Sequence, residues 1–173
     1  MENIKKLCER AKYAAAKINT AGTEDKNRAL FQIADALCKN ADFILRENEK
    51  DLQAGRESGM SDALLDRLAL SRSRIEGMAQ GVREVAELPD PCGEIIGEFT
   101  HKNGMKITKK RVPMGIIGII YEARPNVTSD AASLCLKAGS AVILRGGKEA
   151  YNSNKAIADV MRKALAQAAF DEN

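Results

Sequence analysis

The spacing of apolar residues divides the chain into a helical first half and a mixed second half. Up to about residue 88, apolar side chains recur at intervals of three and four residues, beginning with Ile4, Leu7 and Ala11. This period places them on one face of an α-helix. Pro89-Asp90-Pro91 ends the pattern, because proline cannot continue a helix. Residues 1–91 are therefore predicted to be helices that pack through their apolar faces.

Polar residues and glycine mark where the individual helices are predicted to start and stop. Thr23, Asn40, Ser61 and Ser71 each precede an apolar run and are predicted N-caps, since their side chains can accept a hydrogen bond from a free backbone N–H. Gly55 is predicted to end the third of these helices, because glycine adopts the left-handed conformation that commonly follows a helix.

A β-hairpin is predicted between the helical half and the rest of the chain. The runs 94–99 and 105–111 have strand-like composition and flank His101-Lys102-Asn103-Gly104. Asn-Gly between two such runs is a strong signal for a tight hairpin turn. The second run carries three lysines and Arg111, which suits an exposed ribbon better than a buried strand.

The second half has the order strand, elbow, helix, strand and basic glycine loop. An apolar strand over 115–121 leads into the elbow Glu122-Ala-Arg-Pro-Asn126, and a helix is predicted over about 128–137. A second strand over 141–144 precedes the glycine loop Arg145-Gly-Gly-Lys148, and a final helix is predicted from Asn152 or Ser153. This is the layout of a nucleotide-binding α/β unit, whose functional groups gather at the C-terminal ends of the strands. Parallel strands need neighbours on both sides, so the chain is expected to be the front part of a larger protein.

Composition argues against several classes of protein. Of the 173 residues, 45% are hydrophobic and 29% are charged, and the net charge is +3, which is typical of an ordered globular protein. Cations and acids are interleaved, Trp is absent and aromatic residues make up 4%, so no nucleic-acid partner is expected. The longest nearly apolar run, 112–121, is too short to span a bilayer, and no membrane association is expected.

The cysteines and the N-terminus favour a reduced cytoplasmic protein without a metal. The four cysteines are widely spaced, no Cys-x-x-Cys pair occurs, and His101 is the single histidine, so neither a metal site nor a disulfide framework is expected. The chain enters an amphipathic helix without the apolar segment of a secretory signal. Cys135 lies among apolar helix positions and is expected to pack, whereas Cys92 lies in a loop with no visible group to activate its thiol.

Polar segments at the two strand ends are candidate binding sites. Arg124 can hold a carboxylate or phosphate through two hydrogen bonds, and the amide of Asn126 can stabilise a developing oxyanion. Arg145 and Lys148 flank two glycines and can receive a phosphate, with the dipole of the following helix adding to the attraction. A turn fixed by Pro125 and a solvated strand-to-helix connection are the structural alternatives. Neither Gly-x-Gly-x-x-Gly nor a Walker A sequence occurs, so neither common phosphate loop is predicted.

The segment 112–154 resembles one enzyme family closely. Its runs Pro113-Met-Gly-Ile-Ile-Gly-Ile-Ile-Tyr-Glu-Ala-Arg-Pro-Asn-Val-Thr128 and Ile143-Leu-Arg-Gly-Gly-Lys-Glu-Ala-Tyr-Asn-Ser-Asn154 are similar to gamma-glutamyl phosphate reductases, members of the aldehyde dehydrogenase superfamily. The resemblance covers the whole chain, as the N-terminal part of such an enzyme. It implies an α/β, aldehyde dehydrogenase-like fold with N-terminal helices, a β-hairpin and the start of a parallel-sheet cofactor-binding domain.

The same resemblance implies a reaction, a cofactor and partners. The family reduces L-glutamyl 5-phosphate to L-glutamate 5-semialdehyde with NADPH and releases phosphate, in proline biosynthesis. A cysteine thiolate attacks the acyl phosphate, and hydride reduces the resulting thioester. NADPH is thus the expected cofactor and L-glutamyl 5-phosphate the expected substrate. Assembly into a homo-oligomer through the hairpin is expected, as is contact with a glutamate 5-kinase.

The resemblance also divides the chain. Residues 1–91 are expected to be the helical part of the cofactor-binding domain, 92–112 the oligomerisation hairpin, and 113–173 the start of the NADPH-binding unit. The family's catalytic domain, with its catalytic cysteine, has no counterpart in the sequence, so the chain alone is expected to be inactive. The alternatives are a non-catalytic fragment that binds NADPH or protein partners, and catalysis through Cys92.

The resemblance also implies which residues of this chain form the binding site, position by position. The residues expected at the cofactor are Tyr121, Glu122, Ala123, Arg145, Gly146, Gly147 and Lys148. The first three would line the nicotinamide side, and a cation at Lys148 would favour the 2′-phosphate of NADPH. Either Arg124 or Asn126 resembles the oxyanion position, and the elbow does not decide between them. Ser140 departs from the asparagine that is usual in the family.

Overall fold

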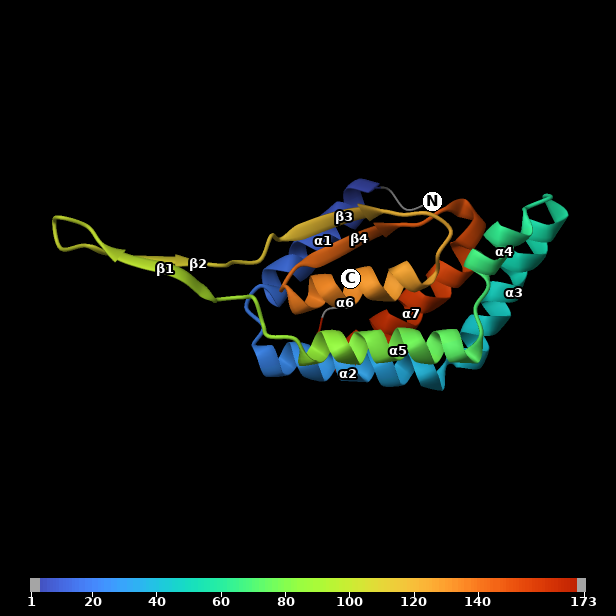
Figure 1. Cartoon of the computed structure of the whole chain (residues 1–173), viewed down its shortest axis with the longest axis horizontal. Coiled ribbons are helices and arrows are strands. Elements are labelled where there is room, and N and C mark those ends of the chain that lie inside the picture. Colours follow the sequence, from blue (N-terminus) through green and yellow to red (C-terminus); the bar gives the residue numbers. More distant parts are fainter. Residues whose placement is uncertain (1–3, 171–173) are drawn as a thin grey trace.

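The computed structural model describes residues 4–170 and has a helical body from which one hairpin projects (Figure 1). Its helices are α1 (Ile4–Ile18), α2 (Thr23–Lys39), α3 (Ala41–Glu57), α4 (Asp62–Leu68), α5 (Arg72–Glu87), α6 (Asn126–Lys137), the 3₁₀ helix η1 (Lys148–Ala150) and α7 (Tyr151–Gln167). The strands are β1 (Ile95–Thr100), β2 (Lys106–Lys110), β3 (Ile116–Ile120) and β4 (Ala141–Arg145). The predicted order of helices, hairpin and α/β unit is confirmed.

The hydrophobic core lies where α2 and α5 pack side by side beneath α6 and α7 (Figure 1). Its largest fully buried apolar side chains come from four helices: Leu30, Ile33, Leu37, Ile44, Ile75, Val82 and Ile157. Burial of one such side chain contributes about 1.5–3 kcal/mol. The N-terminal helices therefore supply most of the core on which the α/β unit rests.

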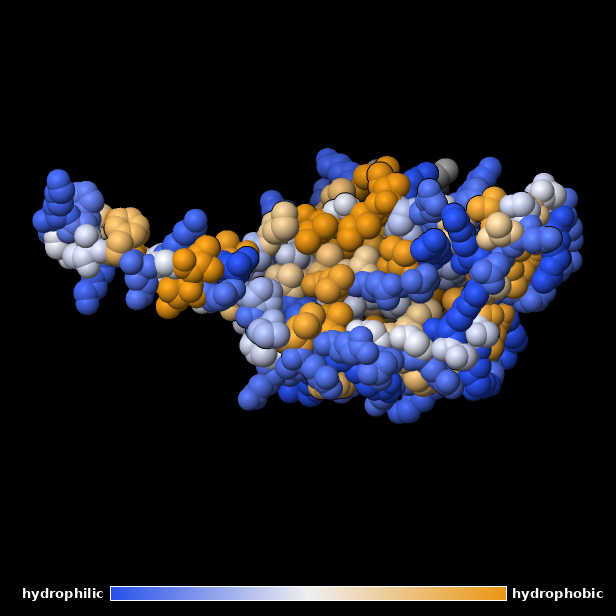
Figure 2. Space-filling view, viewed as in Figure 1, coloured by the Kyte–Doolittle hydropathy of each residue, from blue (hydrophilic) through white to orange (hydrophobic). Residues whose placement is uncertain are grey.

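β3 and β4 form a parallel pair, in register from Ile116 opposite Ala141 to Ile120 opposite Arg145. α1 contacts both strands and α6 contacts β4. Within residues 4–170, β3 and β4 pair with no other strand. Figure 2 shows hydrophobic residues gathered over this region, where Met114 and Ile120 are exposed. The outer surface of the pair is thus apolar and uncovered by the described residues.

At three predicted helix ends the structure differs, at least in part, from the prediction. Asn40 occupies the N-cap position of α3, as predicted, but its side chain forms no capping bond, and its amide donates to the carbonyl of Ala36 at 2.8 Å. α3 continues past Gly55, where an added Cβ would lie 3.0 Å from the side chain of Leu65. Gly55 therefore allows α4 to approach α3, and it does not end the helix.

The third difference is Thr23, which is the first residue of α2 and not its N-cap. Its hydroxyl donates to the carboxylate of Asp90 at 2.7 Å, a contact between residues far apart in sequence. The prediction for Ser71 is confirmed, since its hydroxyl accepts from the N–H of Arg74. Ser61 occupies the N-cap position of α4 without a side-chain capping bond.

No helix among the described residues is long and apolar enough to cross a bilayer.

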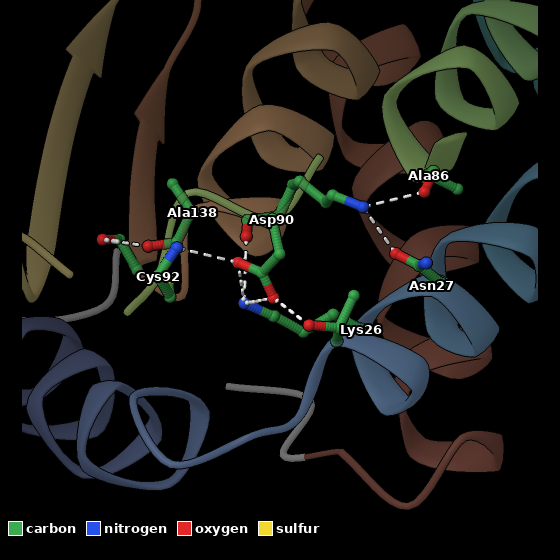
Figure 3. A network of polar contacts seen from close by, with 9 residues as sticks. Lys26, Asn27, Ala86, Asp90, Cys92 and Ala138 are labelled. Carbon is green, nitrogen blue, oxygen red and sulfur yellow. Dashed lines mark hydrogen bonds and ion pairs between the residues drawn. The ribbon is translucent and has the colours of Figure 1, made fainter. Parts of the chain in front are cut away.

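Lys26, Asp90 and Lys137 form a buried charge cluster beside the base of the hairpin (Figure 3). The ammonium of Lys26 contacts both carboxylate oxygens of Asp90, at 2.7 and 2.8 Å, and also donates to the carbonyl of Lys137. The ammonium of Lys137 donates to the Asn27 side chain and to the carbonyl of Ala86. The cluster thus joins α2, α5, α6 and the segment leading into the hairpin.

The surroundings of Asp90 set its ionisation. Burial alone would raise the pKa of this carboxyl, but hydrogen bonds from Lys26, Thr23 and the Cys92 amide, with the charge of Lys26, lower the pKa to about 2. Burial lowers the pKa of Lys137, although the charge of Asp90 acts in the opposite direction. The cluster therefore requires an ionised Asp90.

Asp90 is predicted to stabilise the fold at neutral pH and to lose this effect in acid. Its folded pKa of about 2 lies below the ordinary value of 3.8, so the contribution is present above pH 3.8 and is lost as pH falls through 2. The free energy of unfolding in urea, measured from pH 7 to pH 2, should show Asp90→Asn less stable than the wild type at pH 7, with the difference shrinking in acid.

The matched control is Asp42→Asn, which removes an ion pair between Arg72 and a carboxylate whose side chain is 74% exposed. Such exposed pairs contribute little, so this variant should track the wild type at every pH. A difference for Asp90→Asn that is as large at pH 2 as at pH 7 would contradict the role of the ionised carboxylate.

Candidate functional site

The two segments predicted to bind the cofactor meet at the C-terminal ends of β3 and β4. The N–H of Tyr121 donates to the carbonyl of Arg145 at 3.0 Å, and the N–H of Gly147 lies 3.4 Å from the carbonyl of Glu122. A Cβ at Gly147 would lie 3.5 Å from the N–H nitrogen of Ala123. The structure therefore places the start of the elbow directly against the glycine loop.

A chain of hydrogen bonds lies beneath this junction. The hydroxyl of Tyr121 is 2.6 Å from that of Thr128 in α6, and the Thr128 hydroxyl donates to the side-chain oxygen of Asn154 in α7 at 3.1 Å. Because Thr128 has one hydroxyl proton and gives it to Asn154, Tyr121 must donate to Thr128. Burial raises the pKa of Tyr121, and the bond to Thr128 acts in the opposite direction. These bonds tie β3, α6 and α7 together.

Gly146 is required at this junction by close packing. A Cβ there would lie 3.0 and 3.1 Å from the ring and hydroxyl of Tyr121, and closer still to the amide nitrogen of Asn154. Its φ is not in the left-handed region, so backbone freedom is not the reason for glycine. Thr128 and Asn154 were not predicted as site residues, because their contacts join elements that no local spacing connects.

The N-terminus of α7 is already occupied by a carboxylate from α3. Asp51, which is 4% exposed, accepts hydrogen bonds from the N–H groups of Asn152 and Ser153 at 3.1 and 2.7 Å. The side chains of both residues also donate to it. Asp51 therefore takes the N–H groups of Asn152 and Ser153, and the prediction that this helix N-terminus helps to bind a phosphate on the glycine loop is wrong.

The elbow presents its two candidate residues differently. Arg124 is exposed, and among the described residues its guanidinium has no partner. Asn126 is the first residue of α6, and its side-chain amide donates to the carboxylate of Asp130 at 3.0 Å. Burial raises the pKa of Asp130, while its bonds to Asn126 and Ser129 lower it. Arg124 is the freer of the two groups.

Arg145 and Lys148 are exposed as well, and neither forms an ion pair within the part of the chain that the structure describes. They lie at the end of β4 and the start of η1. From this end, a groove of about 440 Å³ runs along β4 between α1 and α7, with Tyr121, Gly146 and Asn154 in its wall. Its volume is in the range of small-molecule sites. Residues 4–170 contain no group of three or more His, Cys, Asp or Glu that could hold a metal ion.

Comparison with solved structures defines the class of fold. A probable aldehyde dehydrogenase from Listeria monocytogenes EGD-e superposes with a TM-score of 0.67 over 96% of this chain and 34% of that one, at 13% sequence identity. At this identity the likeness concerns the fold alone. The chain thus has an aldehyde dehydrogenase-like fold, as predicted. No family model matches the sequence.

Two further comparisons are far more specific. The gamma-glutamyl phosphate reductase of Thermotoga maritima superposes with a TM-score of 0.96 at 40% identity, over 99% of this chain and 41% of that one. The gamma-glutamyl phosphate reductase of Geobacillus sp. (strain WCH70) is 55% identical over 162 residues, which are 94% of this chain and 39% of the relative. The chain is therefore homologous to gamma-glutamyl phosphate reductase. It spans about two fifths of the length of the curated relatives it matches.

Gly146→Ala is predicted to destabilise the chain by about 1–3 kcal/mol, because the new methyl group must displace Asn154 and Tyr121. Gly77→Ala in α5 is the matched control, since a Cβ there meets nothing within 4 Å. It should stabilise by about 0.5–1 kcal/mol, because alanine favours a helix over glycine. Urea unfolding of both variants measures these changes, and an unchanged stability for Gly146→Ala would contradict the close packing at the junction.

Proposed function

We propose that the chain forms part of the NADPH site of an enzyme that reduces L-glutamyl 5-phosphate to L-glutamate 5-semialdehyde and releases phosphate, in proline biosynthesis. The observation that carries this proposal is the junction of the elbow with the glycine loop at the ends of two parallel strands. It occurs in a chain that is 55% identical to a gamma-glutamyl phosphate reductase, although that relative is much longer. Bound NADPH would supply the hydride.

The residues at the junction fit such a cofactor. Tyr121, Glu122 and Ala123 line the nicotinamide side in this proposal, and Arg145 with Gly146 and Gly147 borders the adenosine half. The positions of both glycines support this, because they let the loop lie against Tyr121 and the backbone of Glu122 and Ala123. Lys148 would bind the 2′-phosphate. Its exposure and its lack of a partner among the described residues support that role.

Arg124 is proposed to bind the anionic end of the substrate. Its guanidinium suits a phosphate or carboxylate, and no carboxylate of the described chain competes for it. The amide of Asn126 is held by Asp130, which leaves its second N–H for an oxyanion. The substrate reaches a catalytic cysteine in the remaining part of the enzyme in this proposal, so the isolated chain is inactive.

The division of the chain belongs to the same proposal. Residues 1–91 and 113–173 build the cofactor-binding part, and 92–112 is the oligomerisation element. The projection of β1 and β2 from the body supports the last point, as does the exposure of Ile95 and Phe99 on the hairpin (Figure 1). A cytoplasmic location and contact with a glutamate 5-kinase follow from the family and are proposed with it.

The reverse reaction tests the proposed activity. The purified chain is incubated with glutamate 5-semialdehyde, phosphate and NADP⁺, with and without a polypeptide that carries the remaining part of the Thermotoga maritima reductase. NADPH should appear only in the mixture. NADPH formation by the chain alone that is lost in Cys92→Ala would contradict the assignment of the catalytic cysteine to the remaining part. Cofactor binding without activity in the mixture would favour a non-catalytic binding module.

Lys148→Gln is predicted to weaken NADPH binding by about 10-fold or more and to leave NADH binding unchanged, because a charged hydrogen bond contributes about 1.5–3 kcal/mol. Titration calorimetry with each cofactor measures both affinities. Lys163→Gln is the control, because this exposed lysine lies on α7 outside the groove lining. An equal loss for both cofactors would contradict a contact with the 2′-phosphate.

A further inference from the structure

The hairpin extends away from the helical body, and its direction is fixed at its base (Figure 1). Every residue of β1 is exposed, as is every residue of β2 except the half-buried Ile107. A six-residue strand such as β1 is about 20 Å long, so a tilt of about 10° at the base would move its far end by about 3 Å. Contacts at the base therefore decide where the tip of the hairpin lies.

The segment entering the hairpin is held by charge. Asp90 is linked to Lys26 through both of its carboxylate oxygens and to Thr23 by a third contact. The same carboxylate accepts from the N–H of Cys92 at 2.9 Å, two residues closer to the hairpin. The side chains of Lys26 and Asp90 are 1% and 10% exposed. Their attraction is thus poorly screened by solvent.

The segment leaving the hairpin is held by neutral contacts. The N–H of Met114 donates to the hydroxyl of Ser140 at 3.2 Å. Pro113 packs against Gly139, where an added Cβ would lie 2.9 Å from it. Cys92 of the entering segment lies against the same glycine, 3.1 Å from that Cβ, so the entering segment has this neutral contact beside its charged one. A backbone hydrogen bond joins the two segments, in which the N–H of Gly93 donates to the carbonyl of Arg111 at 3.0 Å. They therefore move as a unit.

The two anchors differ in strength. Hydrogen bonds between charged groups are about twice as strong as neutral ones, and removing one partner of a buried ion pair leaves an uncompensated charge. Lys26 also donates to the carbonyl of Lys137 in the last turn of α6. The ammonium of Lys26 thus connects the hairpin base to the helix whose first turn follows Arg124 in the elbow.

From these contacts we propose that Lys26 and Asp90 form a clamp that sets the direction of the hairpin relative to the body. Lys26 is a positioning residue in this proposal, and it acts through Asp90 and the carbonyl of Lys137. The clamp holds the hairpin and α6 as one rigid unit. The proposal depends on neither the cofactor nor the reaction proposed above, so it can fail or hold independently of them.

The test is NMR of the full chain, because backbone amide signals report the hairpin and the body separately. In the wild type, residual dipolar couplings of β1 and β2 should fit the same alignment tensor as those of the helices. Their order parameters should be near the rigid value of about 0.85. In Lys26→Met the hairpin should require its own, weaker tensor, and its order parameters should fall below about 0.6, while the helix values stay unchanged.

Lys137→Met is the matched control. It also removes a buried ammonium, but one that contacts Asn27 and Ala86 and not the Asp90 carboxylate. The hairpin should stay aligned with the body in this variant. Alignment that is retained in Lys26→Met, or lost equally in Lys137→Met, would overturn the clamp.

A second variant keeps the test decisive if Lys26→Met fails to fold. Asp90→Asn preserves the size of the side chain and its ability to accept from Cys92, but removes the negative charge. It should release the hairpin in the same measurement, with folded helices. A single alignment tensor for the whole of this variant would overturn the proposal.

Discussion

The contacts that join α2, α5, α6 and the hairpin base centre on two buried lysines, Lys26 and Lys137. A buried ammonium is stable only if its N–H groups are satisfied, and the partners available are one carboxylate, one amide and two backbone carbonyls. Each ammonium is more than 50 residues away in sequence from each of its partners. The requirement therefore orders α2, the end of α5, the end of α6 and the hairpin base together (Figure 3).

The same principle places the other helix of the α/β unit. The carboxylate of Asp51 caps α7 from α3, and the buried amide of Asn48 donates to Ser153 and to the carbonyl of Leu68. Each end of the α/β unit thus rests on a polar side chain from the first half of the chain. Apolar packing stabilises the body, and these polar contacts fix the positions of its helices. If one helix shifted along another, the buried polar groups would lose their hydrogen-bond partners.

Much of the fold was predictable because its signals are local. The helical period, the Asn-Gly turn and the apolar strands identified every major element, and the resemblance to one family identified the fold class. The ends of helices were less predictable. Thr23 and Asn40 had the composition of caps, but their side chains bond to Asp90 and Ala36, and Gly55 serves the packing of α4. Those contacts depend on which elements lie side by side.

The residues of the candidate site also divide into those that the sequence could predict and those that it could not. The residues of the elbow and the glycine loop could be selected because polar groups that follow parallel strands gather at one edge of a sheet. Thr128, Asn154 and Asp51 could not, since their roles arise from α6, α7 and α3 coming together. Asp51 also changed the expected chemistry, because it removes the helix N-terminus of α7 from anion binding.

The charges at the strand ends are distinguished by their position in the fold. Like the exposed Arg46 and Arg67, Arg124 and Arg145 form no ion pair within residues 4–170, but these two lie at or just beyond the ends of strands that end side by side. Exposed ion pairs are weak, so their absence costs little stability. It leaves two cations available at the ends of two neighbouring strands. A ligand with separated anionic groups would satisfy both cations, and the protein would not have to break any contact of its own to bind it.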